Sequence, residues 1–226
     1  MPAIKAKKAP VADQAALVRL GAKVRARLAA DPAVYHVPCE QAELFAAADF
    51  LSEAECARLI AMIDDVARPS PVYGGPDAAA YRTSFSGDVD PGDSFVRMIE
   101  RRICDLMGIE QSWSETFQGQ RYQPGQEFQS HCDWYDTSAD YWSGESRRGG
   151  QRSWTAMAWL NEVEEGGTTQ FTRLGLGFPP QAGSLLMWNN ALPDGRPNLD
   201  TMHAGLPVAR GVKYVITKWF RTRAWS

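Results

Sequence analysis

The chain has 226 residues, of which 44% are hydrophobic and 23% charged, a composition typical of a soluble globular protein with a sizeable core. Its formal net charge of −3 gives no reason to expect nucleic acid or an anionic membrane as a partner. The four cysteines are widely spaced without a Cys-x-x-Cys pair, which favours reduced thiols over a disulfide framework or a zinc knuckle. No apolar run has the length of a signal or transmembrane segment, so we expect a cytoplasmic protein.

The amino-terminal part of the sequence predicts two helices. Residues 1–12 lack hydrophobic periodicity and are expected to form a flexible lead, whereas residues 13–30 carry leucine and valine at helical spacing. Ser52, followed three positions later by Glu55, has the form of a capping box. This pattern predicts a second helix that ends near Ala67.

Short strands and a third helix complete the first half. We expect an apolar strand over residues 44–50, before the second helix, and another strand near residues 82–86. A loop rich in proline and glycine surrounds this second strand. Residues 95–107 have the periodicity of an amphipathic helix.

After Gly108 the sequence changes to short runs rich in Val, Thr, Phe, Tyr and Trp, separated by Gly, Pro, Asp and Asn. Many short strands at intervals predict a β-sandwich or barrel, against which the earlier helices pack. We therefore expect a mainly β fold with supporting helices, of the α+β class. Residues 1–40 would form a lead and a helix, and residues 41–226 one domain, with helical support over 41–110 and a β core over 111–226.

One of the three histidines stands next to an aspartate, in the sequence His131-Cys132-Asp133. On a strand or at its end, His131 and Asp133 point to the same face and Cys132 points away, toward packing. A second histidine would complete a triad of two histidines and one carboxylate, which leaves part of the coordination sphere of Fe(II) open. His203, just before an apolar strand, suits this role better than His36, which is expected to be a loop or packing residue. The alternative is that these residues are unrelated polar positions and do not form a triad.

The strand predicted near the end of the sequence carries two lysines, Lys213 and Lys218, on opposite faces. If the strand is central, one of them must point inward, and a buried ammonium needs a counter-charge. An edge strand would leave both lysines solvated. The functional interpretation is that Lys213 points inward and that its partner is the carboxylate of a ligand.

From about Phe45 to Trp219 the sequence resembles the prolyl 4-hydroxylase-type family of Fe(II)- and 2-oxoglutarate-dependent dioxygenases. The order of the matching stretches and the ten-residue step from His203 to Lys213 make this resemblance far more specific than the His-x-Asp pattern. The first forty residues lie outside it. The matching stretches are RYQPGQEFQSHCDWY, GGQRSWTAMAWLNEVEEGGTTQF, PPQAGSLLMWNN and HAGLPVARGVKYVITKW.

The resemblance implies a distorted double-stranded β-helix (jelly roll) with supporting helices on one side. It implies that His131, Asp133 and His203 bind Fe(II), and that Lys213 pairs with the distal carboxylate of 2-oxoglutarate. O₂ would be the oxidant, and ascorbate would have a supporting role. The other residues that it places around the cosubstrate are Tyr122, Thr169 (with Thr168 as the alternative in register) and Trp219, for which ordinary core or strand positions are the alternative.

Two segments are expected on the substrate side. The loop rich in proline and glycine holds Arg82-Thr83-Ser84, which resembles the family's RTS element, and the corresponding loop in the family can fold over the active site. The segment after Asp133 is expected to be a solvated polar loop with aromatic side chains beneath it. Within it, Arg152 resembles a family arginine that borders the peptide groove, and Trp134 and Tyr135 are further candidates for substrate contact.

The leading hypothesis is a 2-oxoglutarate-dependent dioxygenase that hydroxylates a C–H bond of a prolyl peptide or another amino-acid-type substrate, with succinate and CO₂ as co-products. The same machinery acting on a non-peptidyl small molecule, by hydroxylation, demethylation or desaturation, is the alternative. A non-catalytic jelly-roll binding module would be favoured by loss of a triad member or of Lys213, and all four are present. A cupin-like zinc or manganese site calls for more histidines. The oligomeric state is open.

Overall fold

The computed structural model describes residues 13–71 and 81–226. The expected flexible lead over residues 1–12, and the part of the expected lid at residues 72–80, lie outside the described residues. Among the described helices, none is both long enough and apolar enough to cross a bilayer. The cytoplasmic localisation stays a prediction.

The described chain alternates a few helices with many short strands. The helices are α1 (Gln14–Ala30), α2 (Glu53–Val66), α3 (Ser94–Met107) and α4 (Trp142–Arg148), with the 3-10 turns η2 (Gln111–Trp113) and η3 (Leu199–Thr201). The strands are β1 (Tyr35–His36), β2 (Leu44–Ala47), β3 (Arg68–Pro69), β4 (Phe85–Asp88), β5 (Gln118–Tyr122), β6 (Phe128–His131), β7 (Arg152–Trp159), β8 (Glu165–Gly166), β9 (Thr169–Phe171), β10 (Leu176–Phe178), β11 (Leu185–Asn189), β12 (His203–Gly205), β13 (Val208–Arg210) and β14 (Lys213–Arg221).

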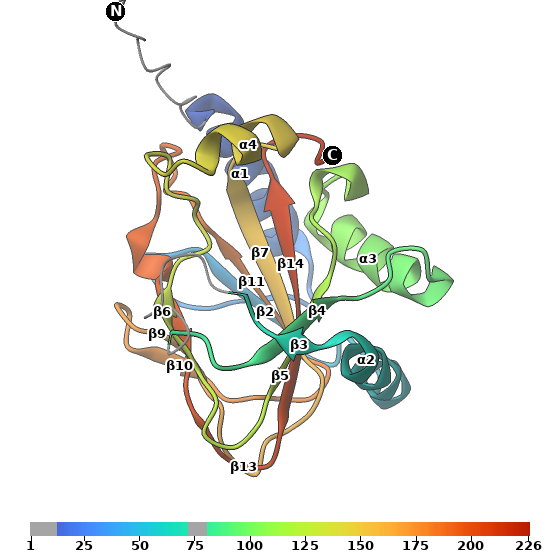
Figure 1. The fold of residues 1–226 in the computed structure, drawn as a ribbon. Coiled ribbons are helices and arrows are strands. Elements are labelled where there is room, and N and C mark those ends of the chain that lie inside the picture. Colours follow the sequence, from blue (N-terminus) through green and yellow to red (C-terminus); the bar gives the residue numbers. More distant parts are fainter. Residues whose placement is uncertain (1–12, 72–80) are drawn as a thin grey trace, which may run out of the picture.

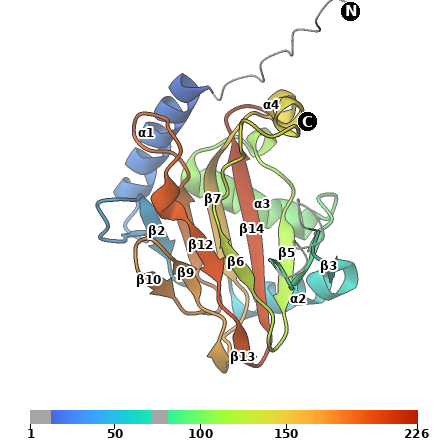
Figure 2. The same cartoon turned by 60° about the vertical axis from the view of Figure 1, so that its left-hand side comes forward.

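Two antiparallel sheets form the body of the molecule. The major sheet has the strand order β1-β2-β11-β7-β14-β5-β4-β3, and the minor sheet has the order β10-β9-β12-β6. Figure 2 shows the minor sheet in front of the major sheet, with α3 behind the major sheet and α1 and α2 at its two sides. The predicted double-stranded β-helix with helices on one side is therefore confirmed (Figure 1).

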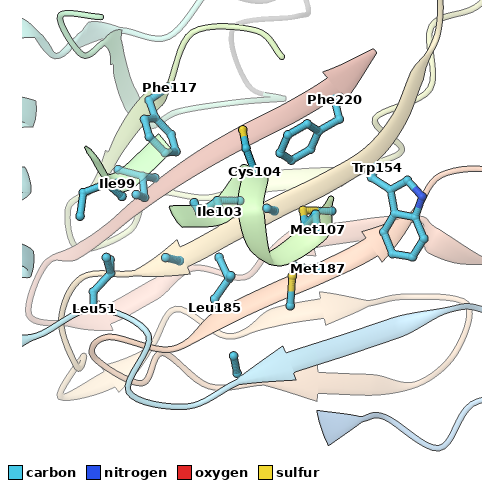
Figure 3. Close-up of a cluster of buried hydrophobic side chains, with 14 of the residues drawn as sticks. Leu51, Ile99, Ile103, Cys104, Met107, Phe117, Trp154, Leu185, Met187 and Phe220 are labelled. Atoms are coloured by element: carbon cyan, nitrogen blue, oxygen red, sulfur yellow. The ribbon is translucent and has the colours of Figure 1, made fainter. Parts of the chain in front are cut away.

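The helices pack on the outer face of the major sheet through one large hydrophobic cluster. Alternation along the strands supplies the sheet's part of this cluster, with Trp154 of β7 and Phe220 of β14 both fully buried. Ile103 and Met107 of α3 meet them from the helical side (Figure 3). A second cluster, built around Trp188 and including Leu44, Tyr122, Met157, Phe171 and Val215, fills the space between the two sheets.

The helix ends follow the signals in the sequence. At the predicted capping box the N–H of Glu55 donates to Ser52 Oγ at 3.3 Å, and the N–H of Ser52 donates to Glu55 Oε2 at 2.9 Å. Helix α3 is capped by the Asp93 carboxylate at its start. It ends at Gly108, whose φ of 67° lies in the left-handed region that glycine adopts without strain.

Two local predictions differ from the structure. The strand expected at residues 82–86 begins later, as β4 at Phe85. Residues 82 and 83 pair instead with the edge of the minor sheet, where Arg82 bridges to Phe128 and the Thr83 N–H donates to the Glu127 carbonyl. The segment after Asp133 is not simply a solvated loop. It contains the helix α4, and the buried Trp142 of this helix agrees with the expectation that aromatic side chains lie beneath the segment.

Both lysines of β14 are buried, whereas the sequence predicted that one would point inward. The strand is central, between β7 and β5, so both of its faces are covered. Lys218 faces the helices and forms an ion pair with Glu100 of α3. Glu100 also accepts a hydrogen bond from Gln111 Nε2 at 2.6 Å. The counter-charge on this face is therefore part of the protein itself.

Replacing Lys218 with methionine is expected to lower the free energy of unfolding by about 3–5 kcal/mol, because the Glu100 carboxylate would remain buried without a cation. Urea denaturation measures this loss. The double variant Lys218→Met, Glu100→Gln should recover much of it, since the uncompensated charge is then gone. A single variant as stable as the native chain would show that this ion pair does not support the helical layer.

Candidate functional site

The three predicted metal-ligand candidates come together where the minor sheet opens toward the major one. His131 ends β6 and His203 begins β12, and the two are direct partners in the antiparallel register of these strands. Asp133 follows two residues after His131. One ligand atom from each of the three side chains lies within 4.8 Å of the others. His36, by contrast, is exposed and stacks on Phe45, with ring centroids 4.6 Å apart.

Both histidines are oriented in the same way. The Nδ1 atom of His131 lies 2.9 Å from the Gln129 carbonyl, and the Nδ1 atom of His203 lies 2.9 Å from the Thr201 carbonyl. A carbonyl oxygen only accepts, so Nδ1 carries the proton in each ring. The Nε2 lone pairs are then free, which is the form in which a neutral histidine binds a metal.

The electrostatic environment of these side chains favours the binding of a cation. Burial, together with the neighbouring His203, lowers the pKa of His131 to about 3, so its imidazole is neutral. Burial alone would raise the pKa of Asp133, but His203, His131 and Arg152 outweigh that effect and hold it below its ordinary value. Two imidazole rings and one carboxylate therefore form a largely buried donor set.

An inner pocket extends from these three residues to Lys213 at the start of β14. The Lys213 side chain is 2% exposed, and its Nζ donates to Thr169 Oγ1 at 3.2 Å. It also lies 5.3 Å from the ring centroid of Tyr122, its cross-strand partner. Thr169 rather than Thr168 thus faces the pocket. Among the described residues, no carboxylate compensates the Lys213 ammonium, whose pKa is lowered by burial to about 7.

A polar chain lines the same pocket. The hydroxyl of Tyr122 donates to Gln120 Oε1 at 2.6 Å, and Gln120 Nε2 donates to Thr217 Oγ1 at 3.1 Å. Gln120 and Thr217 were not predicted as site residues. The alternation of β14 could have indicated Thr217, which shares a face with Lys213, Val215 and Trp219, and all four line the pocket.

An outer cleft of about 530 Å³ lies next to the candidate ligands His131 and Asp133. Trp134, Tyr135 and Arg152, the predicted substrate contacts, all line it, and Trp219 lies at its junction with the inner pocket. Cys132 points away from the inner pocket as predicted. It is, however, partly exposed along the outer cleft instead of being packed in the core. Further aromatic side chains complete the lining: Tyr81, Phe128, Tyr141 and Trp225.

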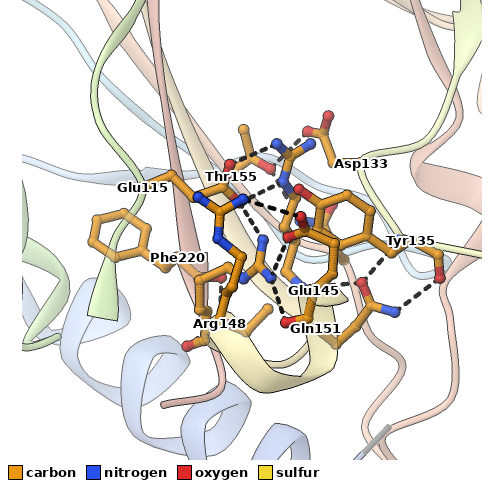
Figure 4. Close-up of polar contacts among 12 residues, drawn as sticks. Glu115, Asp133, Tyr135, Glu145, Arg148, Gln151, Thr155 and Phe220 are labelled. Carbon is orange, nitrogen blue, oxygen red and sulfur yellow. Dashed lines mark hydrogen bonds and ion pairs between the residues drawn. The ribbon is translucent and has the colours of Figure 1, made fainter. Parts of the chain in front are cut away.

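Arg152 is held rigidly at the floor of this cleft. Its Nε and Nη2 donate to the two carboxylate oxygens of Glu115, each at 2.7 Å, and its guanidinium stacks 3.9 Å from the Trp219 ring centroid. Arg221, which is fully buried, binds both Glu115 and Glu145 of α4 at 2.7 and 2.8 Å (Figure 4). This charged cluster ties α4 to the ends of β7 and β14. The sequence did not indicate Glu115 or Glu145.

The free energy of unfolding of the ligand-free chain is expected to increase as the pH rises from about 7 to about 10, because Lys213 loses its proton more easily in the folded state. In the unfolded chain this lysine keeps its proton up to about pH 10.4. In the folded chain it begins to lose the proton near pH 7, so the unfolded state binds more protons in that window. Urea denaturation at pH 7 and pH 9 measures the rise, which should be smaller in Lys213→Met. An equal rise in both proteins would contradict the assignment to Lys213.

Comparison with known proteins gives a consistent picture. Residues 117–221 match the family model described as the 2OG-Fe(II) oxygenase superfamily. The chain is 31% identical to probable prolyl 4-hydroxylase 3 of Arabidopsis thaliana, over 76% of this chain and 66% of that protein. It is 30% identical to probable prolyl 4-hydroxylase 10 of the same plant, over 79% of this chain and 68% of the relative. The chain thus spans about two thirds of these relatives.

A solved structure shares the arrangement described above. The viral collagen prolyl hydroxylase of Paramecium Bursaria Chlorella virus-1, determined as a complex with 2OG, superposes with a TM-score of 0.62 at 27% identity. The match covers 79% of this chain and 95% of the viral protein. The similarity therefore extends over most of this chain and nearly all of the viral protein.

Proposed function

Because the chain belongs to the prolyl 4-hydroxylase-type 2OG-Fe(II) oxygenases, we propose that it hydroxylates a prolyl residue of a peptide, with conversion of 2-oxoglutarate and O₂ to succinate and CO₂. The single observation that carries the proposal is the inner pocket. It has a two-histidine-one-carboxylate donor set at one end and, at the other, a buried ammonium that no carboxylate of the described residues compensates.

The donor set fits Fe(II). Two imidazole nitrogens and one carboxylate oxygen, within 4.8 Å of one another, are the ligands of non-haem iron oxygenases. The hydrogen bonds from both Nδ1 atoms leave only the Nε2 atoms to bind. Three protein ligands do not saturate an ion that takes up to six, so positions remain for the cosubstrate and for O₂.

The other end of the pocket fits 2-oxoglutarate. A buried lysine without a counter-ion is costly, and the distal carboxylate of the cosubstrate would supply the missing charge. The hydroxyl of Thr169 is already in contact with Lys213 and would share that carboxylate. Tyr122, which packs beside Lys213, offers a second hydroxyl in the same pocket.

The metal and the cosubstrate together supply the activation of O₂ and the oxidising power needed to convert a C–H bond to C–OH. The chain's own residues bind and orient the reactants. His131, Asp133 and His203 would hold the ion, and Lys213 would set the direction in which the cosubstrate lies. Trp188 and Phe171 pack around His203 and shield that side of the metal end of the pocket from bulk water.

The outer cleft supports a peptide as the acceptor. It opens beside His131 and Asp133, and its volume and aromatic lining suit an extended segment with a proline ring. Trp134, Tyr135 and Arg152 are proposed as contacts to that segment. Because Glu115 occupies two donors of Arg152 and Trp219 stacks on its guanidinium, we infer that this arginine meets the segment mainly through its remaining nitrogen.

The decisive experiment is a turnover assay with Fe(II), 2-oxoglutarate and proline-containing peptides, read by mass spectrometry. The proposal expects a peptide product heavier by one oxygen, formed in step with succinate. A free amino acid or small molecule that gains oxygen while peptides do not would overturn the choice of acceptor. An iron-loaded chain that binds no 2-oxoglutarate in calorimetry would overturn the oxygenase itself. Binding of 2-oxoglutarate without succinate from any acceptor would indicate a binding module.

A further inference from the structure

The second carboxylate oxygen of Asp133 has a dedicated partner inside the protein. Thr155 Oγ1 lies 2.7 Å from Asp133 Oδ2. Thr155 belongs to β7, is fully buried, and lies beside Asp133 in Figure 4. Asp133 itself lies beyond the end of β6, outside any strand, so the sheet ladder does not fix its side chain.

The direction of this hydrogen bond follows from its chemistry. An ionised carboxylate only accepts, so the proton of the Thr155 hydroxyl must point to Asp133. The hydroxyl oxygen then has its lone pairs free, and it accepts from Asn190 Nδ2 at 2.9 Å. The amide of Asn190 can therefore adopt only one of its two orientations. Asn190, Thr155 and Asp133 form a one-way chain of hydrogen bonds.

Both donors sit on rigid backbone. Thr155 pairs with Trp188 of β11 on one side and with Trp219 of β14 on the other, in the middle of the major sheet. Asn190 is 1% exposed; its N–H donates to the Ser153 carbonyl at 2.8 Å, and its carbonyl accepts from Asn198 at 2.9 Å. Neither side chain can follow a rotating carboxylate without leaving a buried polar group unpaired.

We propose that Thr155 and Asn190 are positioning residues that hold Asp133 as a one-oxygen ligand. This inference rests on the metal site of the proposed function. With Oδ2 bound to Thr155, only Oδ1 is presented to the ion. A carboxylate free to rotate could bind through both oxygens and occupy one more coordination position. The hydrogen-bond chain thereby keeps that position for the cosubstrate or O₂.

The test compares three variants of the full chain for metal binding alone. Thr155→Val keeps the shape of the side chain but removes the hydroxyl, whereas Thr155→Ser keeps the hydroxyl. Ser153→Ala is the matched control, because Ser153 is a buried hydroxyl on the same strand that donates to the Phe220 carbonyl instead. The readouts are the Kd for Mn(II) by calorimetry and the visible absorption of the Co(II)-loaded protein, which reports coordination number.

Thr155→Val is expected to raise the Kd for Mn(II) about tenfold or more, as loss of groups that orient metal ligands does. It should also change the Co(II) spectrum. Thr155→Ser and Ser153→Ala should keep the native Kd and spectrum. A Thr155→Val protein with native values for both readouts would overturn the inference while leaving the metal site intact. A native chain that binds neither ion would instead overturn the proposed function.

A fourth variant keeps the test decisive if the Thr155→Val protein does not fold. Asn190→Ala keeps the Thr155 hydroxyl but removes the amide that restricts it. We then expect the Kd for Mn(II) to rise by less than in Thr155→Val. The Co(II) spectrum should shift in the same direction as in Thr155→Val, because Asp133 is held less firmly. Native values in a folded Asn190→Ala protein would count against the hydrogen-bond chain.

Discussion

Alanine in place of His131 or Asp133 is expected to reduce the 2-oxoglutarate-dependent formation of succinate to background. Each residue contributes one of the three ligands that the described residues offer, so two of these remain to hold the ion. The affinity for Mn(II) should fall more than about a hundredfold, because removing groups that merely orient metal ligands already costs 10–100-fold. Calorimetry gives the affinity, and succinate detection gives the turnover.

His36→Ala is the matched control for this loss. His36 is an exposed histidine stacked on Phe45, outside the donor set, so its removal should leave both readouts unchanged. The thermal stability of each protein must be measured without metal, since an unfolded variant would also lose activity. A folded Asp133→Ala protein that still forms succinate at the native rate would show that the metal lies elsewhere.

Lys213→Met is expected to weaken the binding of 2-oxoglutarate while the affinity for Mn(II) stays near its native value. Truncating one member of a buried charge pair costs about 2–5 kcal/mol, which corresponds to at least about thirtyfold in Kd. The free protein should not be destabilised, because in that state the Lys213 ammonium is buried without a carboxylate among the described residues. Calorimetric titration with 2-oxoglutarate and urea denaturation measure the two effects.

Lys218→Met provides the opposite pattern on the same strand. It should lower the free energy of unfolding and leave the Kd for 2-oxoglutarate unchanged in the protein that remains folded. The two substitutions remove the same chemical group, so only the face of β14 distinguishes them. Equal loss of metal and cosubstrate binding in Lys213→Met would mean that Lys213 supports the metal site rather than the cosubstrate.

Local signals in the sequence predicted much of the fold. The capping box at Ser52 and the periodicity of residues 13–30 and 95–107 fixed three helices to within a residue or two, because such patterns act within a few turns. The alternation along β14 placed Lys213 on the pocket face for the same reason. The jelly roll itself followed from the family resemblance together with the many short strands.

The remaining features depend on partners distant in the sequence. The counter-charge of Lys218 is Glu100, 118 residues away, so the pattern of β14 alone could not show that both of its lysines are buried. Glu115 binds Arg221 across 106 residues. Thr155 of the major sheet donates to Asp133, 22 residues away, in the segment that follows β6. A single sequence shows which residue types are present, but not which of them a fold with many long-range pairings brings together.

The position of β14 has a consequence for how the major sheet assembles. This strand comes after every other strand in the sequence, yet it lies between β7 and β5 in the middle of the major sheet. Until β14 pairs with both neighbours, the strands β1-β2-β11-β7 and β5-β4-β3 cannot join, and the edges of β7 and β5 that face each other remain open to pairing. A chain stopped before Lys213 would possess His131, Asp133 and His203 but no joined sheet to carry them. Joining the two parts of the major sheet therefore requires insertion of β14 between two open strand edges, which can pair with other chains until that step is complete.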